Sequence, residues 1–160
     1  MTTPIEPPPA LLNIADVVQG PIPPREVNAA WPNMFHTRIA VVVDKMGPPP
    51  WSVRLIQDER NLVTLIANGP GTGNRPHWHK DFDEWWFIVA GTLQWELTGG
   101  TVVVAEKDSL VWVPRGTVHH IQNVGSGLSL RVAVAMPPAV HYYSPCEQCG
   151  YQDDGPAAFW

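Results

Sequence analysis

The feature that most constrains this sequence is a series of short apolar runs, each ended by glycine, proline, asparagine or aspartate. The runs are rich in β-branched and aromatic residues and recur at the spacing of about 8 to 12 residues that is typical of sandwiches and barrels. No window of about twelve residues repeats apolar positions at helical spacing, so the crossover helices of a parallel α/β sheet are missing. The sequence therefore predicts an all-β domain, with strands at 38–44, 51–57, 62–68, 77–79, 84–90, 93–98, 101–105, 110–113, 118–123 and 128–136.

The two ends of the chain differ from this middle part. Eight of the 18 prolines lie in residues 1–33, and because proline fixes φ and lacks an amide donor, we expect residues 1–37 to form an extended arm. Within this arm only 11–18 has the composition of a short helix. The β domain spans 38–136, and residues 137–160 are expected to form a tail that docks on the domain or on a partner.

Composition excludes several classes of protein. A length of 160 residues with 44% hydrophobic and 16% charged residues suits one globular domain and offers no apolar stretch of about 20 residues for a membrane span. The net charge of -5, with scattered lysines and arginines, argues against nucleic-acid binding. The first six residues have neither the positive nor the apolar region of a secretory signal, and two cysteines make no disulfide framework, so we expect a cytoplasmic protein.

Four side chains have the types and spacing of metal ligands. His77 and His79 are two residues apart, which on a strand places both imidazoles on one face. Glu84 follows after a short connection and can return its carboxylate to the same interior, and His119 opens another predicted strand. Three imidazoles and a carboxylate suit Fe(II), Mn(II), Ni(II), Zn(II) or Cu(II), and in an octahedral ion they leave two positions open. We therefore predict a catalytic centre for one divalent metal ion.

The same residues form two known sequence motifs. Gly71, His77, His79, Glu84 and Gly91 fit G-x5-H-x-H-x4-E-x6-G. The second motif, G-x5-P-x-G-x2-H-x3-N, is fitted by Pro114, Gly116, His119 and Asn123, with Asp108 in place of its first glycine. In these motifs the chain resembles the cupins, which are small β barrels of double-stranded β-helix or jelly-roll fold. The resemblance implies that fold for about 38–136 and a metal held by both motifs, and the change at Asp108 should alter a turn rather than the site.

A narrower resemblance is to the 3-hydroxyanthranilate dioxygenases, cupins that cleave an aromatic ring with Fe(II) and dioxygen. Arg75 precedes His79 as their substrate-binding arginine precedes its ligand, and residues 142–150 are similar to the start of their C-terminal Cys-x-x-Cys segment. The chain departs from that family in the third imidazole, His77, and in Asn123, which stands where a second substrate arginine would be. The resemblance therefore implies iron and dioxygen chemistry but not the substrate.

Strand alternation predicts which residues surround the metal. Trp86 and Ile88 share the inward face with Glu84, and Ile121 shares the face of His119, so all three are candidate walls of a substrate pocket. The tryptophans could equally pack the core or a dimer interface. Two polar residues are candidate catalytic groups. Arg75 could clamp a carboxylate or phenolate, or be an exposed loop charge, and Asn123 could orient a ligand or be structural.

The C-terminal part suggests further contacts. Cys146 and Cys149 have the spacing of half a zinc site, which His141 or the same pair in a second chain could complete; free thiols or a redox pair are the alternatives. The proline-rich arm and the apolar sheet faces could cover a partner's edge strand, so we expect a homodimer.

These observations leave three functional hypotheses open. The leading one is a non-haem Fe(II) dioxygenase of a small, aromatic or enolisable oxygenated substrate. The second is a Mn, Ni or Zn cupin that acts as an isomerase, decarboxylase or lyase without dioxygen. The third is a metal-dependent small-ligand binding protein without turnover. Turnover under anaerobiosis would favour the second, and a ligand recovered unchanged the third.

Overall fold

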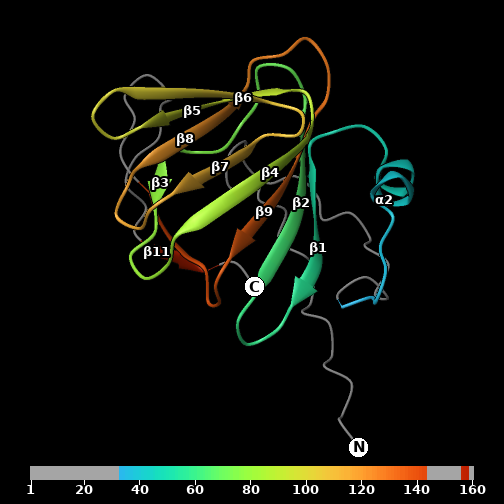
Figure 1. The fold of residues 1–160 in the computed structure, drawn as a ribbon, viewed down its shortest axis with the longest axis horizontal. Helices are drawn as coiled ribbons and strands as arrows, with labels where there is room; N and C mark the ends of the chain where they lie inside the picture. The colour runs from blue at the N-terminus through green and yellow to red at the C-terminus, as the bar shows by residue number, and fades with distance from the viewer. Residues whose placement is uncertain (1–32, 144–155, 159–160) are drawn as a thin grey trace, which may run out of the picture.

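The computed structural model describes residues 33–143 and the backbone of residues 156–158, which form two antiparallel sheets that face each other (Figure 1). The five-stranded sheet has the order β1-β2-β9-β4-β7, and the six-stranded sheet has the order β11-β10-β3-β8-β5-β6. This arrangement confirms the predicted all-β fold. In chain order the elements are α2 (Ile39–Met46), β1 (Trp51–Gln57), β2 (Leu62–Asn68), β3 (His77–Trp78), β4 (Glu84–Ala90), β5 (Thr92–Leu97), β6 (Thr101–Glu106), β7 (Leu110–Val113), β8 (His119–Asn123), β9 (Ser129–Ala135), β10 (Val140–Tyr143) and β11 (Pro156–Ala158).

The main core lies between the two sheets. Trp86 and Ile88 of β4 are buried against Trp95 of β5 and Ile121 of β8. Trp85 and Phe87, which alternate with these two residues on β4, face the other way, and Trp85 is 37% exposed. Strand alternation therefore assigns the inward residues of β4 and β8 correctly, because one face of each strand is buried and the other is not.

The predicted strand at 38–44 is wrong, because Ile39–Met46 form helix α2. Its buried residues Val42 and Met46 are four apart, and they pack with Trp51 and Leu65 on the face of the five-stranded sheet that is turned away from the main core. Figure 1 shows α2 beside β1, at the opposite side of the molecule from β3. Burial of one helical stripe on the sheet outweighs the strand preference of this β-branched run.

Strand β10 is a second difference from the sequence prediction, which places no strand in 137–143. It pairs with β3 through Tyr142 opposite Trp78 and Tyr143 opposite His77. The segment is therefore built into the six-stranded sheet beside the predicted metal ligands. The other predicted strands are present, with ends that differ by at most one residue.

Two turns have backbone conformations that suit their residue types. Gly99 and Gly100, between β5 and β6, have φ of 85° and 81°, the positive values that a tight turn needs. Asp108, between β6 and β7, has φ of 66°, which aspartate tolerates better than most residues. The altered motif position is thus a left-handed turn residue outside the candidate site.

Among the described residues no helix has the length and hydropathy to cross a membrane.

Candidate metal centre

The four predicted ligands converge inside the fold. One ligand atom from each of His77, His79, Glu84 and His119 can be chosen so that all four lie within 4.8 Å of one another, and all four residues are buried. His77 of β3 lies opposite His119 of β8 in the six-stranded sheet, whereas Glu84 begins β4 of the other sheet. His79 follows β3 directly. The centre therefore joins the two sheets.

Backbone carbonyls orient the three imidazoles. His77 Nδ1 lies 2.8 Å from the Arg75 carbonyl, His79 Nδ1 lies 3.2 Å from that of Val140, and His119 Nδ1 lies 3.1 Å from that of Thr117. A carbonyl only accepts hydrogen bonds, so a neutral His119, whose Nε2 has no partner, donates from Nδ1 and keeps its lone pair on Nε2. This is the arrangement of metal-binding histidines, whose second nitrogen is commonly fixed by a carbonyl or carboxylate.

His119 provides the test of whether the residues fit a metal. Its Nε2 is buried, has no hydrogen-bond partner, and lies 3.5 Å from Glu84 Oε2. A buried lone pair without a donor is costly unless a ligand or ion satisfies it. The donor set of three nitrogens and one carboxylate suits a divalent transition metal, so the residues fit such an ion.

Glu84 is held as a carboxylate. Its Oε2 lies 2.8 Å from His79 Nε2. Burial favours the protonated form, but the neighbouring imidazoles of His79 and His119 outweigh it and hold the pKa of Glu84 well below its usual value. The residue therefore offers a negative charge to a cation at neutral pH.

His77 is held neutral. Burial, followed by the charges of His119, His141 and His79, lowers its pKa well below the usual value. A neutral imidazole is the form that binds metals, because protonation would occupy the lone pair. Removing the proton in advance lowers the cost of metal binding at this position.

Two residues beside the ligands were not predicted to belong to the site. The ring of His141, on β10, lies 4.7 Å from that of His77 and 4.4 Å from that of His79, centre to centre. Phe82 stacks on His79 at 4.2 Å. His141 carries no motif, and only the pairing of β10 with β3 reveals its place. Phe82 lies inside the first motif, but at a position that the motif leaves open.

The predicted pocket residues are deeply buried. Trp86 lies 5.4 Å from the His119 ring, centre to centre, so it adjoins the metal ligands. Ile88 and Ile121 belong with it to the core between the sheets. All three therefore face the interior shared with the metal centre, and their contact with a substrate stays a prediction.

The two candidate catalytic residues differ in their surroundings. Arg75 is buried, not an exposed loop charge, and its guanidinium carbon lies 4.3 Å above the centre of the Tyr143 ring. Asn123 is also buried, and its amide nitrogen donates to the carbonyls of Asn68 and Gly127. Its oxygen accepts from the amide of Gly125. These contacts give Asn123 a structural role in the turn after β8.

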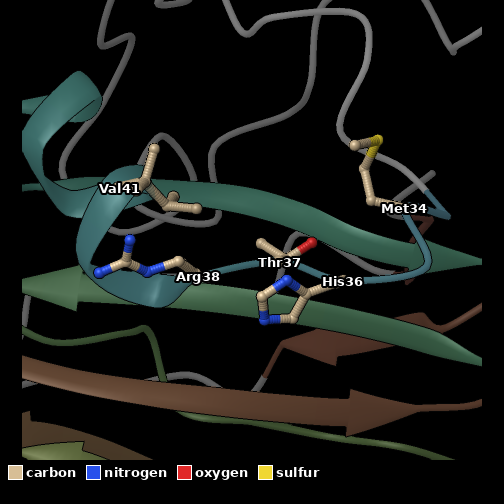
Figure 2. A pocket seen from close by; sticks show the side chains of 6 residues that line it. Met34, His36, Thr37, Arg38 and Val41 are labelled. Atoms are coloured by element: carbon tan, nitrogen blue, oxygen red, sulfur yellow. The ribbon is translucent and has the colours of Figure 1, made fainter.

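The remaining predicted ligands, Cys146 and Cys149, lie outside the described residues. His141, their possible third partner, lies instead beside the His77 and His79 rings. A surface pocket next to α2 has a volume of about 240 Å³. None of the predicted site residues lines it (Figure 2). Its lining residues are Met34, His36, Thr37, Arg38, Val41 and Val42.

Comparison with known proteins shows a similarity to the cupin domain. Residues 64–136 match the family model of the cupin domain. Over 78 residues, 48% of this chain, the sequence is 35% identical to a protein of Vibrio cholerae serotype O1 that is named as a mannose-1-phosphate guanylyltransferase. This chain spans only 17% of the length of that protein.

Solved structures show the same fold. A Klebsiella pneumoniae protein with a double-stranded β-helix domain has a TM-score of 0.53 and 21% identity, covering 59% of this chain and 81% of its own. A cupin-like protein of Thermotoga maritima has a TM-score of 0.51 and 17% identity, covering 54% of this chain and 67% of its own. A Thermus thermophilus protein has a TM-score of 0.50 and 23% identity, and the match covers 54% of this chain and 81% of the Thermus chain. These likenesses establish the double-stranded β-helix.

Proposed function

We propose that the domain at residues 64–136, which matches the cupin family model, is a metal-dependent enzyme, a non-haem Fe(II) dioxygenase that acts on a small oxygenated substrate. The observation that carries the proposal is the convergence of three imidazoles and one carboxylate. A closed structural zinc site takes four ligands in a tetrahedron, often with cysteines. A set of three histidines and a glutamate is instead typical of an ion that keeps positions open for small molecules.

The residues around the ligands prepare them for this chemistry. The carbonyls of Arg75, Val140 and Thr117 contact Nδ1 of each imidazole and so fix its orientation, which reduces the reorganisation that metal binding requires. Trp86 packs against the ring of His119, and Phe82 stacks on the ring of His79, which limits the room for water beside both rings. Bound iron would supply redox chemistry toward dioxygen, and the protein would supply orientation and a dry environment.

The first experiment measures metal content. The protein is loaded anaerobically with Fe(II), desalted, and analysed for iron beside His119→Ala and the matched control His120→Ala, which changes the neighbouring residue on the opposite face of β8. We expect about one iron per chain in the wild type and in His120→Ala, and at least a tenfold loss of affinity in His119→Ala. Equal iron in all three proteins would contradict the assignment of the centre.

The second experiment tests the reaction. Oxygen uptake by the iron-loaded protein is measured with catechols, aminophenols, hydroxybenzoates and β-diketones. Uptake that depends on His119 is the expected result. Turnover of a small acid without oxygen would replace the dioxygenase by a non-oxidative Mn, Ni or Zn enzyme. A ligand bound and recovered unchanged would indicate a binding protein.

We also propose that two copies of the domain associate through the outward face of β4 and β7. Trp85 lies opposite Trp112, and Phe87 lies opposite Leu110, so four large apolar side chains form one outward patch. Trp112 is 57% exposed and Leu110 is 64% exposed. β7 is also the edge of its sheet among the described strands, and an apolar patch beside an open edge suits self-association.

A further inference from the structure

Two arginines are buried on the inner face of the five-stranded sheet. Arg131 of β9 is 1% exposed, and it lies two residues from Ala133, which packs in the core between the sheets. Arg54 of β1 is 5% exposed and lies opposite Thr64, two residues from the core residue Ile66. Since residues two apart on a strand share a face, both arginines point to the interior that contains the metal centre.

Neither arginine has a carboxylate partner among the described residues. Arg131 Nη1 donates to Asn68 Oδ1 at 2.6 Å, but its Nε has no hydrogen-bond partner. Both Nε and Nη1 of Arg54 lack a partner. Burial lowers the pKa of each guanidinium to about 10, and for Arg131 the charge of Glu84 partly opposes this shift. Both groups are therefore cations at neutral pH with unused donors.

Buried charge of this kind costs stability. Transfer of a guanidinium from water to the interior is unfavourable unless a counter-charge and hydrogen bonds replace its hydration. The residues paired with these arginines or lying beside them on the inner face, such as Thr64, Ile66 and Ala133, carry no charge. The arginines are better explained if an anion completes their hydrogen bonds when it binds.

Strand register connects the arginines to the metal centre. Across the inner face, Arg54 lies opposite Thr64, Thr64 opposite Ala133, and Ala133 opposite Trp86. Trp86 in turn adjoins the ring of His119. The two residues between Arg54 and Trp86 have short side chains, so the guanidinium and the indole flank the same part of the interior.

We infer that Arg54 and Arg131 form an anion subsite that binds the carboxylate of a small organic acid whose opposite end reaches the metal centre. The planar guanidinium matches a carboxylate through paired N–H donors, which favours this anion over a spherical one. The inference rests on the proposed function for the position of the substrate, but the anion subsite is testable without the metal. It assigns acid recognition to residues that lie outside both sequence motifs.

The test measures anion binding by the full chain in metal-free form and after loading with Zn(II). Isothermal titration uses benzoate as the probe, benzamide as its neutral counterpart, and inorganic phosphate as a second anion. The variants are Arg54→Met, which removes one charge, and Arg131→Lys, which keeps the charge but loses the planar fork. Arg60→Gln, at an exposed arginine in the turn after β1, is the control.

We expect benzoate to bind the metal-free protein and benzamide to bind at least tenfold more weakly. Arg54→Met should weaken benzoate at least tenfold and raise the melting temperature, because it replaces an unpaired buried charge by an apolar side chain of similar length. Arg131→Lys should weaken benzoate by a smaller factor, and Arg60→Gln should leave it unchanged.

Several results would overturn the inference. These are equal affinity for benzoate and benzamide, preference for phosphate, or a lower melting temperature in Arg54→Met with unchanged benzoate affinity. The last result would give Arg54 a structural role only. If the protein binds benzoate but no metal, the proposed enzyme is rejected and the anion subsite is retained. If the protein binds iron normally but does not bind benzoate, the subsite is rejected and the proposed enzyme is retained.

Discussion

At the scale of residues, burial lowers the pKa of two histidines at the centre, His77 and His141, and so favours their neutral form. His141 Nδ1 lies 2.7 Å from the Ala139 carbonyl, and the ring packs against His77 and His79. Burial, followed by the charge of His79, lowers the pKa of His141 to about 3. Four imidazoles can share one interior only if few of them carry a proton, so low pH should oppose both folding and metal binding.

The stability of the metal-free protein should therefore depend on pH. Between the ordinary pKa of 6.5 and the folded value of about 3, unfolded His141 binds a proton that the folded residue does not. The free energy of unfolding should then fall as the pH is lowered from 6.5 toward 3, by about 1.4 kcal/mol per pH unit for this residue. His141→Gln should make the slope shallower in urea titrations with chelator present. An unchanged slope would contradict the neutral assignment.

The sequence predicts some of the site residues and misses others. His77, His79, Glu84 and His119 are predictable because their spacing follows from strand alternation and two motifs. His141 is not, since its place depends on the pairing of β10 with β3 across more than 60 residues of chain. Arg131 is a single charged residue at an inward position of an otherwise apolar strand, and neither sequence motif includes it.

At the scale of elements, one close approach determines how the loop before β3 lies on β8. A Cβ added to Gly73 would overlap the Ile121 carbonyl oxygen, so no side chain fits at this position without a shift of the backbone. Next to it, the amide of Asn74 donates to the same carbonyl, and Asn74 Oδ1 accepts from the Ile121 amide. This contact holds β8, which carries His119, against the segment that leads to His77.

Substitution of two neighbouring glycines tests this contact. Gly73→Ala should lower the free energy of unfolding by about 3 kcal/mol, because backbone must move to relieve the overlap. Gly71→Ala meets nothing within 4 Å and adds only the strain of φ +72°, about 1 kcal/mol. Urea denaturation of both variants measures the difference. Equal losses of unfolding free energy in the two variants would show that β8 can shift to make room for a side chain at Gly73. The expected difference is the opposite of what the sequence motif suggests, because Gly71 belongs to the motif and Gly73 does not.

Helix α2 shows where sequence reasoning about elements fails. The run 38–44 is rich in β-branched residues, and local preference predicts a strand. The segment forms a helix because Trp51, Val53 and Leu65 make an apolar surface on the outer face of the five-stranded sheet, and α2 covers this surface. Such a surface exists only after β1 and β2 have paired, so no local pattern contains it. The hairpin at Gly99 and Gly100 was predictable because its determinants are local.

At the scale of the whole molecule, the outward patch of β4 and β7 should control self-association. Trp112→Ser combined with Leu110→Ser removes two of its most exposed side chains and should convert the expected dimer to a monomer. Sedimentation equilibrium measures the mass. The control is Val104→Ser, at a 57% exposed residue of β6 in the other sheet, which should leave the mass unchanged. Dissociation by the control alone would move the interface to β6.

The position of the centre between the two sheets has a consequence for the life of the protein in a cell. Glu84 comes from one sheet, and His77 and His119 come from the other, so an ion held by all three would fasten the sheets together. Proteases cleave chains that open, and a bound ion lowers the population of open chains. The abundance of the protein should then follow the metal supply: starvation for the ion would shorten its half-life before any loss of synthesis, as pulse-chase labelling with a chelator would show.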